Sequence, residues 1–482
     1  MTILQPAEID PIEPAAPPAP RSRVRFAWYA YDWANSVFTT IVTSMFFGPY
    51  LTGITKDAAD PAGFVHPLGL PVRAESFYPF LVALSLILQV LVLPAAGALA
   101  HRVPRNRLLG ALAVFGGTAT VGLALVSHLS FLAGGLLFVA ATLALGASVV
   151  VYDTYLPEIA APPDRADVSS RGAAAGYLGT VVLLVVSISV VLARDSLGLS
   201  EDAAASVCLM LAGLWWAGFS LLPARVLPGT VIRTEQGGAG LGEFRRMWTE
   251  LVRPTATSGD RDGTQPQSTG PRTRSPERDN RKKPRRGGAA VFLVAFLLYN
   301  SAILVISSQG TTFVTEELAV SQDLLVLGVL LVSMVAVLGT MLGGRLASRF
   351  GAPVILLASL AVWLVVVGLQ VTVRPGAMAV LVLIGILVGL VNGTSYALSR
   401  AVFANLTPAG RSAEYFSLFE IVNRSLGAFG VILFGAVVQI TGNYRLAIGT
   451  MSVLFLGGAA LLVVAVVRAV PESLAVGGGR DD

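Results

Sequence analysis

The sequence predicts an all-α integral membrane protein of twelve transmembrane helices, arranged as two six-helix bundles. Three observations predict this fold class. Hydrophobic residues make up 54% of the 482 residues and charged residues only 13%, whereas about a quarter of a typical soluble chain is charged. Apolar stretches long enough to cross a bilayer recur along the chain. A polar segment divides these stretches into six and six, and the chain has too few polar groups to cover a water-facing surface.

The length of a bilayer-crossing helix, about 20 mostly apolar residues, defines the expected spans. Before the central polar segment they are 26–51, 76–100, 107–127, 129–156, 172–193 and 203–225. After it they are 290–314, 322–346, 352–373, 376–402, 413–440 and 443–469.

Polar segments define the expected domain boundaries. Residues 1–25 are proline-rich and are predicted to form a disordered cytoplasmic tail, not a cleaved signal peptide. Residues 228–288 are predicted to form a cytoplasmic linker, with a short amphipathic helix followed by disorder. That helix is expected either on the membrane surface or packed under the helical body. These segments separate an N-terminal bundle at 26–227 from a C-terminal bundle at 289–470, which is followed by a cytoplasmic tail at 471–482.

Basic residues predict the orientation, because cytoplasmic loops are enriched in Lys and Arg. With the N-terminus inside, and the linker left aside, the inside residues are Arg21, Arg23, Arg25, Arg102, Arg105, Arg107, Arg165, Arg171, Arg345, Arg349, Arg400, Arg411, Arg468 and Arg480. The outside residues are Lys56, Arg73, Arg194, Arg374 and Arg445. Both termini are therefore expected in the cytoplasm. Arginine far outnumbers lysine, which favours a GC-rich bacterial source and hence a bacterial inner (plasma) membrane.

A short pattern recurs six spans apart. The second span ends in Gly97-Ala-Leu-Ala-His-Arg102, and the eighth ends in Gly344-Arg-Leu-Ala-Ser-Arg349. Both segments fall on the same side of the predicted topology. A duplicated six-helix unit is typical of secondary transporters, which bind their solute near the bilayer midplane, between the repeats.

With these repeats the chain resembles the major facilitator superfamily, whose signature usually has Asp at the position of His101. More narrowly, it resembles the family that contains the yeast vacuolar amino-acid effluxer linked to autophagy. The matching pieces are Tyr31-Asp-Trp-Ala-Asn-Ser36, Tyr152-Asp-Thr-Tyr-Leu-Pro157, Arg171-Gly with Gly176-Tyr-Leu-Gly179, Phe296-Leu-Leu-Tyr-Asn300, and the run from Ser399-Arg400 to Tyr444-Arg445. The resemblance implies a secondary active transporter that works by alternating access. It also implies a small polar solute, with amino acids favoured and export favoured over import.

Charged groups within spans are the first candidates for a solute or proton site, because each costs at least about 2.5–3.5 kcal/mol on insertion scales. Asp32 shares a helix face with Asn35 at helical spacing. Glu420 and Arg424 are four residues apart, and Arg424 lies roughly 18 Å along its span, near the midplane. Asp32 and Glu420 are candidates for a proton or an amine, and Arg424 for an anionic group. The alternatives are a helix-packing network around Asp32 and a self-neutralised structural pair at Glu420.

Four uncharged residues complete the predicted solute or proton site: Tyr299, Asn300, Asn392 and Asn423. Polar residues of this kind also join helices without touching solute, so both roles stay open for each.

A second set of residues is predicted to form an inner gate. Its members are Gly97, His101, Arg102, Asp153, Arg171, Gly344 and Arg349. Ion pairs among the charged members would hold the cytoplasmic side shut while the outer side is open. The alternative for this set is simple positive-inside charge and helix capping, which is the interpretation we favour for Arg105 and Arg107.

Several function classes are not predicted. The chain has no G-x-x-x-x-G-K-[ST] loop for a nucleotide. It has one cysteine and three scattered histidines, so neither a metal site nor a cofactor is expected. Its basic charge follows the spans, so no nucleic-acid partner is expected, and the partners are a small solute, the lipid bilayer and protons as coupling ion. A monomer that is not an enzyme is expected. The rival function is a lipid flippase, or a membrane-embedded enzyme acting on a lipid-linked substrate.

Overall fold

The structure is a computed structural model of the chain. It describes residues 21–126, 130–231, 287–318, 322–407, 411–426, 428–441 and 443–469. Residues 1–20 of the predicted N-terminal tail, the predicted C-terminal tail and most of the predicted central linker lie outside these residues. Residues 21–25, predicted as part of the disordered tail, are instead the start of the first helix.

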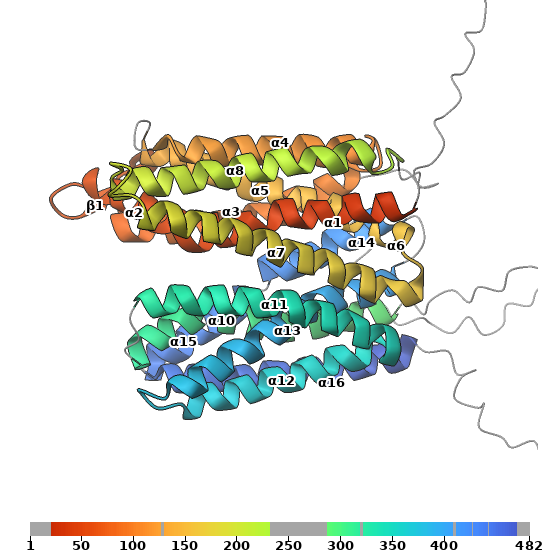
Figure 1. The fold of residues 1–482 in the computed structure, drawn as a ribbon. Helices are drawn as coiled ribbons and strands as arrows, with labels where there is room; N and C mark the ends of the chain where they lie inside the picture. Colours follow the sequence, from red (N-terminus) through yellow and green to blue (C-terminus); the bar gives the residue numbers. More distant parts are fainter. Residues whose placement is uncertain are drawn as a thin grey trace, which may run out of the picture.

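Helices dominate the first half of the chain (Figure 1). The long elements are α1 (Arg21–Val37), η1 (Phe38–Phe46), α2 (Phe47–Asp57), α3 (Ala74–Leu99), α4 (Arg105–Leu123), α5 (Phe131–Asp153), α7 (Arg165–Leu192) and α8 (Glu201–Val226). The short ones are β1 (Phe64–Val65), η2 (Pro67–Gly69), β2 (Val72–Arg73), α6 (Leu156–Ile159) and η4 (Pro162–Asp164). We call α1 to α8 the first half. Its two strands form an antiparallel pair in which Phe64 is opposite Arg73.

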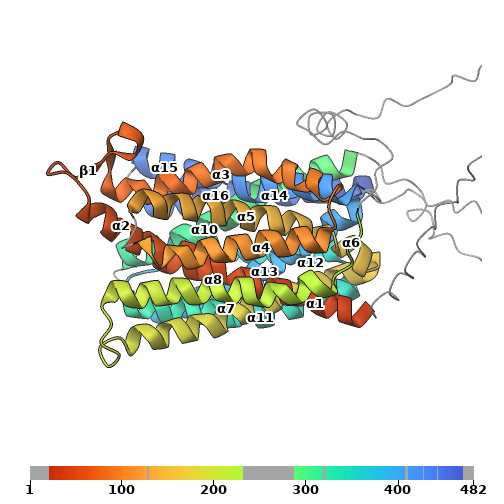
Figure 2. The ribbon, with the colours of Figure 1, turned by 90° about the horizontal axis from the view of Figure 1, so that it is seen from above.

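In the second half, α10 to α16, helices are the only regular secondary structure among the described residues. Its elements are α10 (Gly287–Leu318), α11 (Gln322–Phe350), α12 (Ala352–Thr372), α13 (Met378–Leu406), α14 (Ser412–Glu420), η5 (Ile421–Leu426), α15 (Ala428–Thr441) and α16 (Tyr444–Ala469). The two halves lie side by side with their helices roughly parallel, as Figures 1 and 2 show. The strands lie at one end of the molecule, which we call the hairpin end. The chain enters α1 at the other, which we call the terminal end.

Eleven helices in the described part of the chain are long and apolar enough to cross a membrane by length and composition. The predicted third span, 107–127, corresponds to α4, which is not among the eleven. This helix begins with Arg105, Asn106 and Arg107, and three polar side chains in the first turn lower its hydropathy. It nevertheless packs lengthwise between α5 and α8.

Two spans predicted as regular helices contain π-helical segments. In the first span η1 separates α1 from α2, and in the eleventh η5 separates α14 from α15. π-helical turns are rare and are often found at functional sites, because the wider turn redirects the side chains that follow it. Two predicted candidates, Asn423 and Arg424, lie within η5.

The two halves contact each other through α7 against α11 and α13, and through α14 against α3 and α5. Gly344 of α11 lies where a Cβ atom would come within 2.4 Å of the Cβ of Ser170 on α7. Only glycine allows so close an approach. This contact lies toward the terminal end, six residues before α11 ends.

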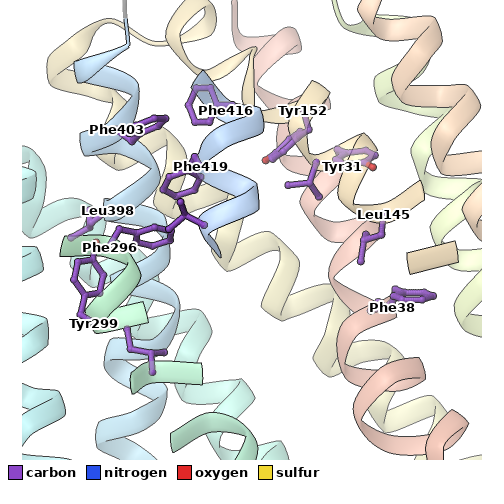
Figure 3. Close-up of a cluster of buried hydrophobic side chains, with 14 of the residues drawn as sticks. Tyr31, Phe38, Leu145, Tyr152, Phe296, Tyr299, Leu398, Phe403, Phe416 and Phe419 are labelled. Atoms are coloured by element: carbon purple, nitrogen blue, oxygen red, sulfur yellow. The ribbon is translucent and has the colours of Figure 1, made fainter. Parts of the chain in front are cut away.

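Aromatic packing fixes the position of α14 within the second half. The ring of Phe419 stacks on Phe296 of α10 at 4.5 Å and on Phe403 of α13 at 5.1 Å, measured between centroids. Figure 3 shows these rings gathered with Phe416 and Tyr299. Because Glu420 follows Phe419 directly, the same packing sets where its carboxylate lies.

Candidate functional site

The centre of the candidate site is Arg400, a fully buried arginine on α13 that bonds across to the first half. Its Nη1 donates to Asp153 Oδ1 at 3.2 Å, and its Nη2 donates to Asp32 Oδ2 at 3.3 Å. Its Nε donates to Ser169 Oγ at 3.0 Å, and Nη2 also donates to the Ser169 carbonyl at 3.1 Å. One guanidinium thus joins α13 to α1, α5 and α7.

Aromatic rings enclose this guanidinium. Its Cζ lies 4.8 Å from the ring of Trp28, 5.4 Å from that of Tyr152 and 5.6 Å from that of Tyr396. Aromatic faces attract cations, and more strongly where water is excluded. The hydroxyl of Tyr152 also donates to Asp32 Oδ2 at 2.7 Å, so Asp32 accepts from both an arginine and a tyrosine.

A second charged group lies on the second half. Arg424 Nε donates to Glu420 Oε2 at 2.7 Å, which is the i,i+4 pair that the spacing predicts. The Glu420 side chain is fully buried, whereas 22% of the Arg424 side chain is exposed. Asn423 Nδ2 lies 3.3 and 3.4 Å from the two Glu420 oxygens, and Asn300 Nδ2 of α10 donates to Asn423 Oδ1 at 3.1 Å.

Tyr396 connects the two groups. Its ring faces the Arg400 guanidinium, and its hydroxyl donates to Glu420 Oε1 at 3.0 Å. We use the name inter-half site for the six residues Asp32, Asp153, Tyr396, Arg400, Glu420 and Arg424. This site holds three carboxyl groups and two guanidinium groups from five helical segments. Within the described residues no three His, Cys, Asp or Glu side chains are placed to hold a metal ion.

Three of the predicted candidates take other positions. The hydroxyl of Tyr299 lies 2.6 Å from Ser399 Oγ and joins α10 to α13. Asn35 is buried on α1, and its Nδ2 has no hydrogen-bond partner in the described part of the chain. Asn392 is half-buried on α13, eight residues before Arg400.

The predicted gate residues divide between the interface and the surface. Asp153 and Gly344 lie at the contact between the halves. Arg102 and Arg349 are exposed at helix ends, Arg349 beside the ring of Phe350. Arg171 is exposed and pairs with Asp167 on its own helix at 2.8 Å, so this ion pair does not join the halves.

The last two gate candidates lie at and just after the end of α3. Gly97 is buried in its last turn, and His101 is half-buried just beyond it.

Sequence reasoning counted Arg400 among the inside basic residues and did not name it as a site residue. A signal was present, because Arg400 lies within the predicted span 376–402. Arg105, interpreted as positive-inside charge and helix capping, has specific partners as well. Its side chain is buried against the ring of Tyr155, and it donates to Glu158 Oε2 at 2.7 Å and to the Thr230 carbonyl at 3.0 Å. Arg105 therefore holds the residues that follow α8 against the terminal end.

A family model described as "Vacuole effluxer Atg22 like" matches residues 21–254 and 273–473. The uncharacterized MFS-type transporter YxiO of Bacillus subtilis (strain 168) is 21% identical over 444 residues, covering 90% of this chain and 93% of that protein. Autophagy-related protein 22-2 of Emericella nidulans is 23% identical over 531 residues, covering 87% of this chain and 86% of that protein.

Solved structures agree in fold. The human organic anion transporter MFSD10 (TETRAN) superposes with a TM-score of 0.69 at 16% identity, over 92% of this chain and 99% of that one. FucP, a Major Facilitator Superfamily transporter in the outward conformation, superposes with a TM-score of 0.63 at 15% identity, over 94% of this chain and 99% of that one. The predicted all-α membrane fold of the major facilitator type is confirmed, as is the predicted family resemblance.

Proposed function

We propose, from the premise that this chain belongs to the Atg22-like vacuole effluxer family, that it moves a small polar solute across its membrane by secondary active transport. The protein is a multi-pass membrane transporter of the major facilitator fold. The favoured solute is an amino acid, and the favoured direction is export. No observation favours a lipid flippase or an enzyme acting on a lipid-linked substrate.

The observation that carries this proposal is the geometry of Arg424. Its Nε is engaged by Glu420, but its two Nη groups have no hydrogen-bond partner among the residues that the structure describes, and the side chain is partly exposed. A guanidinium fork binds a carboxylate with two parallel hydrogen bonds. An α-carboxylate of a solute would give these donors the partner that the protein does not supply.

Glu420 and its amide neighbours would contact the other end of an amino acid. The Glu420 carboxylate, which now accepts from Asn423 Nδ2 at 3.3 Å, would offer acceptors for an ammonium group. A carboxylate and a guanidinium held side by side would complement the opposite charges of a zwitterion. This pairing supports an amino acid over a sugar, which carries neither charge.

Closure at the terminal end supports alternating access. Arg400 binds Asp32 and Asp153 across the interface, and Arg165 Nη1 of α7 donates to the Ala404 carbonyl on α13 at 2.8 Å. If both termini are cytoplasmic in a bacterial plasma membrane, this state is closed toward the cytoplasm. Separation of these contacts would then open the solute site to the inside.

Counterflow into proteoliposomes tests the function. With a labelled amino-acid mixture, we expect uptake by the native protein. We expect no uptake by Arg424→Ala, which lacks the guanidinium for the solute carboxylate, or by Glu420→Gln, which lacks the anion for its ammonium. Arg374→Ala is the matched control, because Arg374 is an exposed arginine outside the site. Thermal unfolding of each variant in detergent checks that it is folded.

Two outcomes would contradict the proposal. Full counterflow by both site variants would remove the solute role of the pair, and absence of uptake by the native protein would remove amino acids as the solute class. Uptake by a monomer reconstituted at one protein per vesicle would show that no second copy is needed.

A further inference from the structure

The charges of the inter-half site do not balance. Asp32, Asp153 and Glu420 contribute three carboxyl groups, whereas Arg400 and Arg424 contribute two guanidinium groups. All five residues lie within the packed helices, and Asp153, Glu420 and Arg400 have almost no exposed surface. A net charge buried in a protein without a partner is strongly unfavourable. One of the three carboxyl groups must therefore be neutral, or a cation must bind.

Glu420 and Asp32 are surrounded by donors that stabilise a carboxylate. Glu420 accepts from the Tyr396 hydroxyl, from the Asn423 amide and from Arg424. Asp32 Oδ2 accepts from the Tyr152 hydroxyl and from Arg400. Hydrogen bonds donated to a carboxylate stabilise its charged form, and each of these two carboxyl groups has at least two donors in place.

Asp153 has the fewest hydrogen-bond donors of the three carboxyl groups. Among the described residues, only its Oδ1 accepts a hydrogen bond, from Arg400 Nη1 at 3.2 Å, and Arg400 is shared with Asp32. Oδ2 is buried and has no hydrogen-bond partner among the described residues. Its side chain has no exposed surface. A carboxylate in this setting would leave one oxygen desolvated and unpaired.

We propose that Asp153 is the proton-binding residue of this transporter, and that it carries a proton on Oδ2 whenever the terminal end is closed. The inference rests on the proposed function, of which it names a residue whose protonation accompanies closure of the terminal end. Binding converts the carboxylate and one proton into a neutral carboxyl group, with the new O–H bond at Oδ2 and no other bond broken. Oδ1 stays an acceptor for Arg400, so the contact between the halves is kept.

The groups that face Asp153 from the neighbouring helices agree with this assignment. Asp32 of α1 and Glu420 of α14 both repel a negative charge at Asp153, and Arg400 of α13 attracts it. Arg424 of η5 is engaged by Glu420, and the hydroxyls of Tyr152 and Tyr396 are directed to Asp32 and Glu420.

Arg105 of α4 does not supply the missing cation. It donates to Thr154, the residue after Asp153, but it also forms its own ion pair with Glu158. That pair is already balanced, so the excess negative charge stays within the inter-half site.

Protonation of Asp153 also makes closure of the terminal end depend on pH. When the halves separate at the terminal end, Asp153 loses Arg400 and meets water, where an aspartate carboxyl group is ionised at neutral pH. Closing the end again requires that the proton be taken back. One proton is thus released to the terminal side and taken back from it in each cycle, so closure of that end depends on the pH on that side.

Infrared spectroscopy of the purified full-length protein, without any solute, tests the assignment. We expect the C=O stretch of one protonated carboxyl group per molecule near neutral pH, shifted in heavy water. Asp153→Asn should lose this band, and Asp195→Asn, which removes a surface carboxylate, should keep it. Asp32→Asn balances the charges, and so it should lose the band as well. Asp153→Glu is therefore the variant that assigns the proton, because it should retain one band at a changed frequency.

Each outcome decides the proposal. It is overturned if the native protein shows no such band, if Asp153→Asn keeps it at full amplitude, or if Asp153→Glu leaves its frequency unchanged. Should Asp153→Asn fail to fold, Asp153→Glu alone gives the answer. The measurement needs no solute, so its failure leaves the counterflow result standing, and a failed counterflow leaves the proton assignment standing.

Discussion

Replacing Arg400 with alanine is expected to abolish transport and to lower the free energy of unfolding by about 3–5 kcal/mol, the range for removing one partner of a buried ion pair. The variant leaves Asp32 and Asp153 without a cation, and it leaves three aromatic rings around an empty volume. Thermal unfolding in detergent measures the loss of stability, and counterflow measures the loss of transport.

A combined variant separates the charge from the packing. Asp32→Asn, Asp153→Asn and Arg400→Leu together remove all three charges and keep the volume of the site nearly constant. We expect this variant to recover most of the stability but none of the coupled transport. An unfolding temperature of Arg400→Ala equal to that of the native protein would show that the cluster does not hold the halves together.

The second large effect is expected from Gly344→Val. A Cβ at this position would lie 2.4 Å from Ser170 Cβ and 2.7 Å from Ser170 Oγ, so the terminal end cannot close as observed. The variant should fold, because each half retains its own packing, yet it should lose transport. Gly328→Val is the matched control on the same helix, since nothing lies within 4 Å of a Cβ there.

Cysteine labelling measures the expected opening of the terminal end in Gly344→Val. Ala166 is buried beside Gly344, and a cysteine placed there should react slowly with a water-soluble maleimide in the native background. In the Gly344→Val background the same cysteine should react much faster, with Cys208 replaced by serine in both chains. Equal labelling rates would mean that the α7–α11 contact can shift without opening the interface.

The parts of the site that sequence could predict are local. Glu420 and Arg424 are four residues apart on one helix, so their pairing follows from helix geometry alone. The membrane spans were also predictable from local information, because hydropathy is summed over neighbouring residues along the chain. The π-helical segment η5 could not be predicted, since nothing in the sequence of residues 421–426 distinguishes it from an ordinary α-helical turn.

The pairing of Arg400 with its carboxylate partners depends on how the helices pack. Arg400 and Asp32 are 368 residues apart, and no spacing rule connects α13 to α1. Asp153 was predicted as a gate residue through family resemblance, but its partner could not be named. An arginine inside a predicted span should have been treated as buried, because a charge at that depth needs a partner. This reasoning does not extend to Arg105, which lies outside the predicted span 107–127 and is buried by the packing around the start of α4.

The stacking of Arg400 on Trp28 gives the protein an optical reporter of its own conformation. Trp28 is fully buried, its indole N–H donates to the Tyr152 carbonyl at 3.2 Å, and a guanidinium lies 4.8 Å from its ring. Indole emission depends on nearby charge and on water. Opening the terminal end would remove the charge and admit water, so Trp28 emission should change, whereas Trp216 and Trp363 are buried within single halves. The difference spectrum between the native protein and Trp28→Phe would follow the movement of the halves without any attached dye.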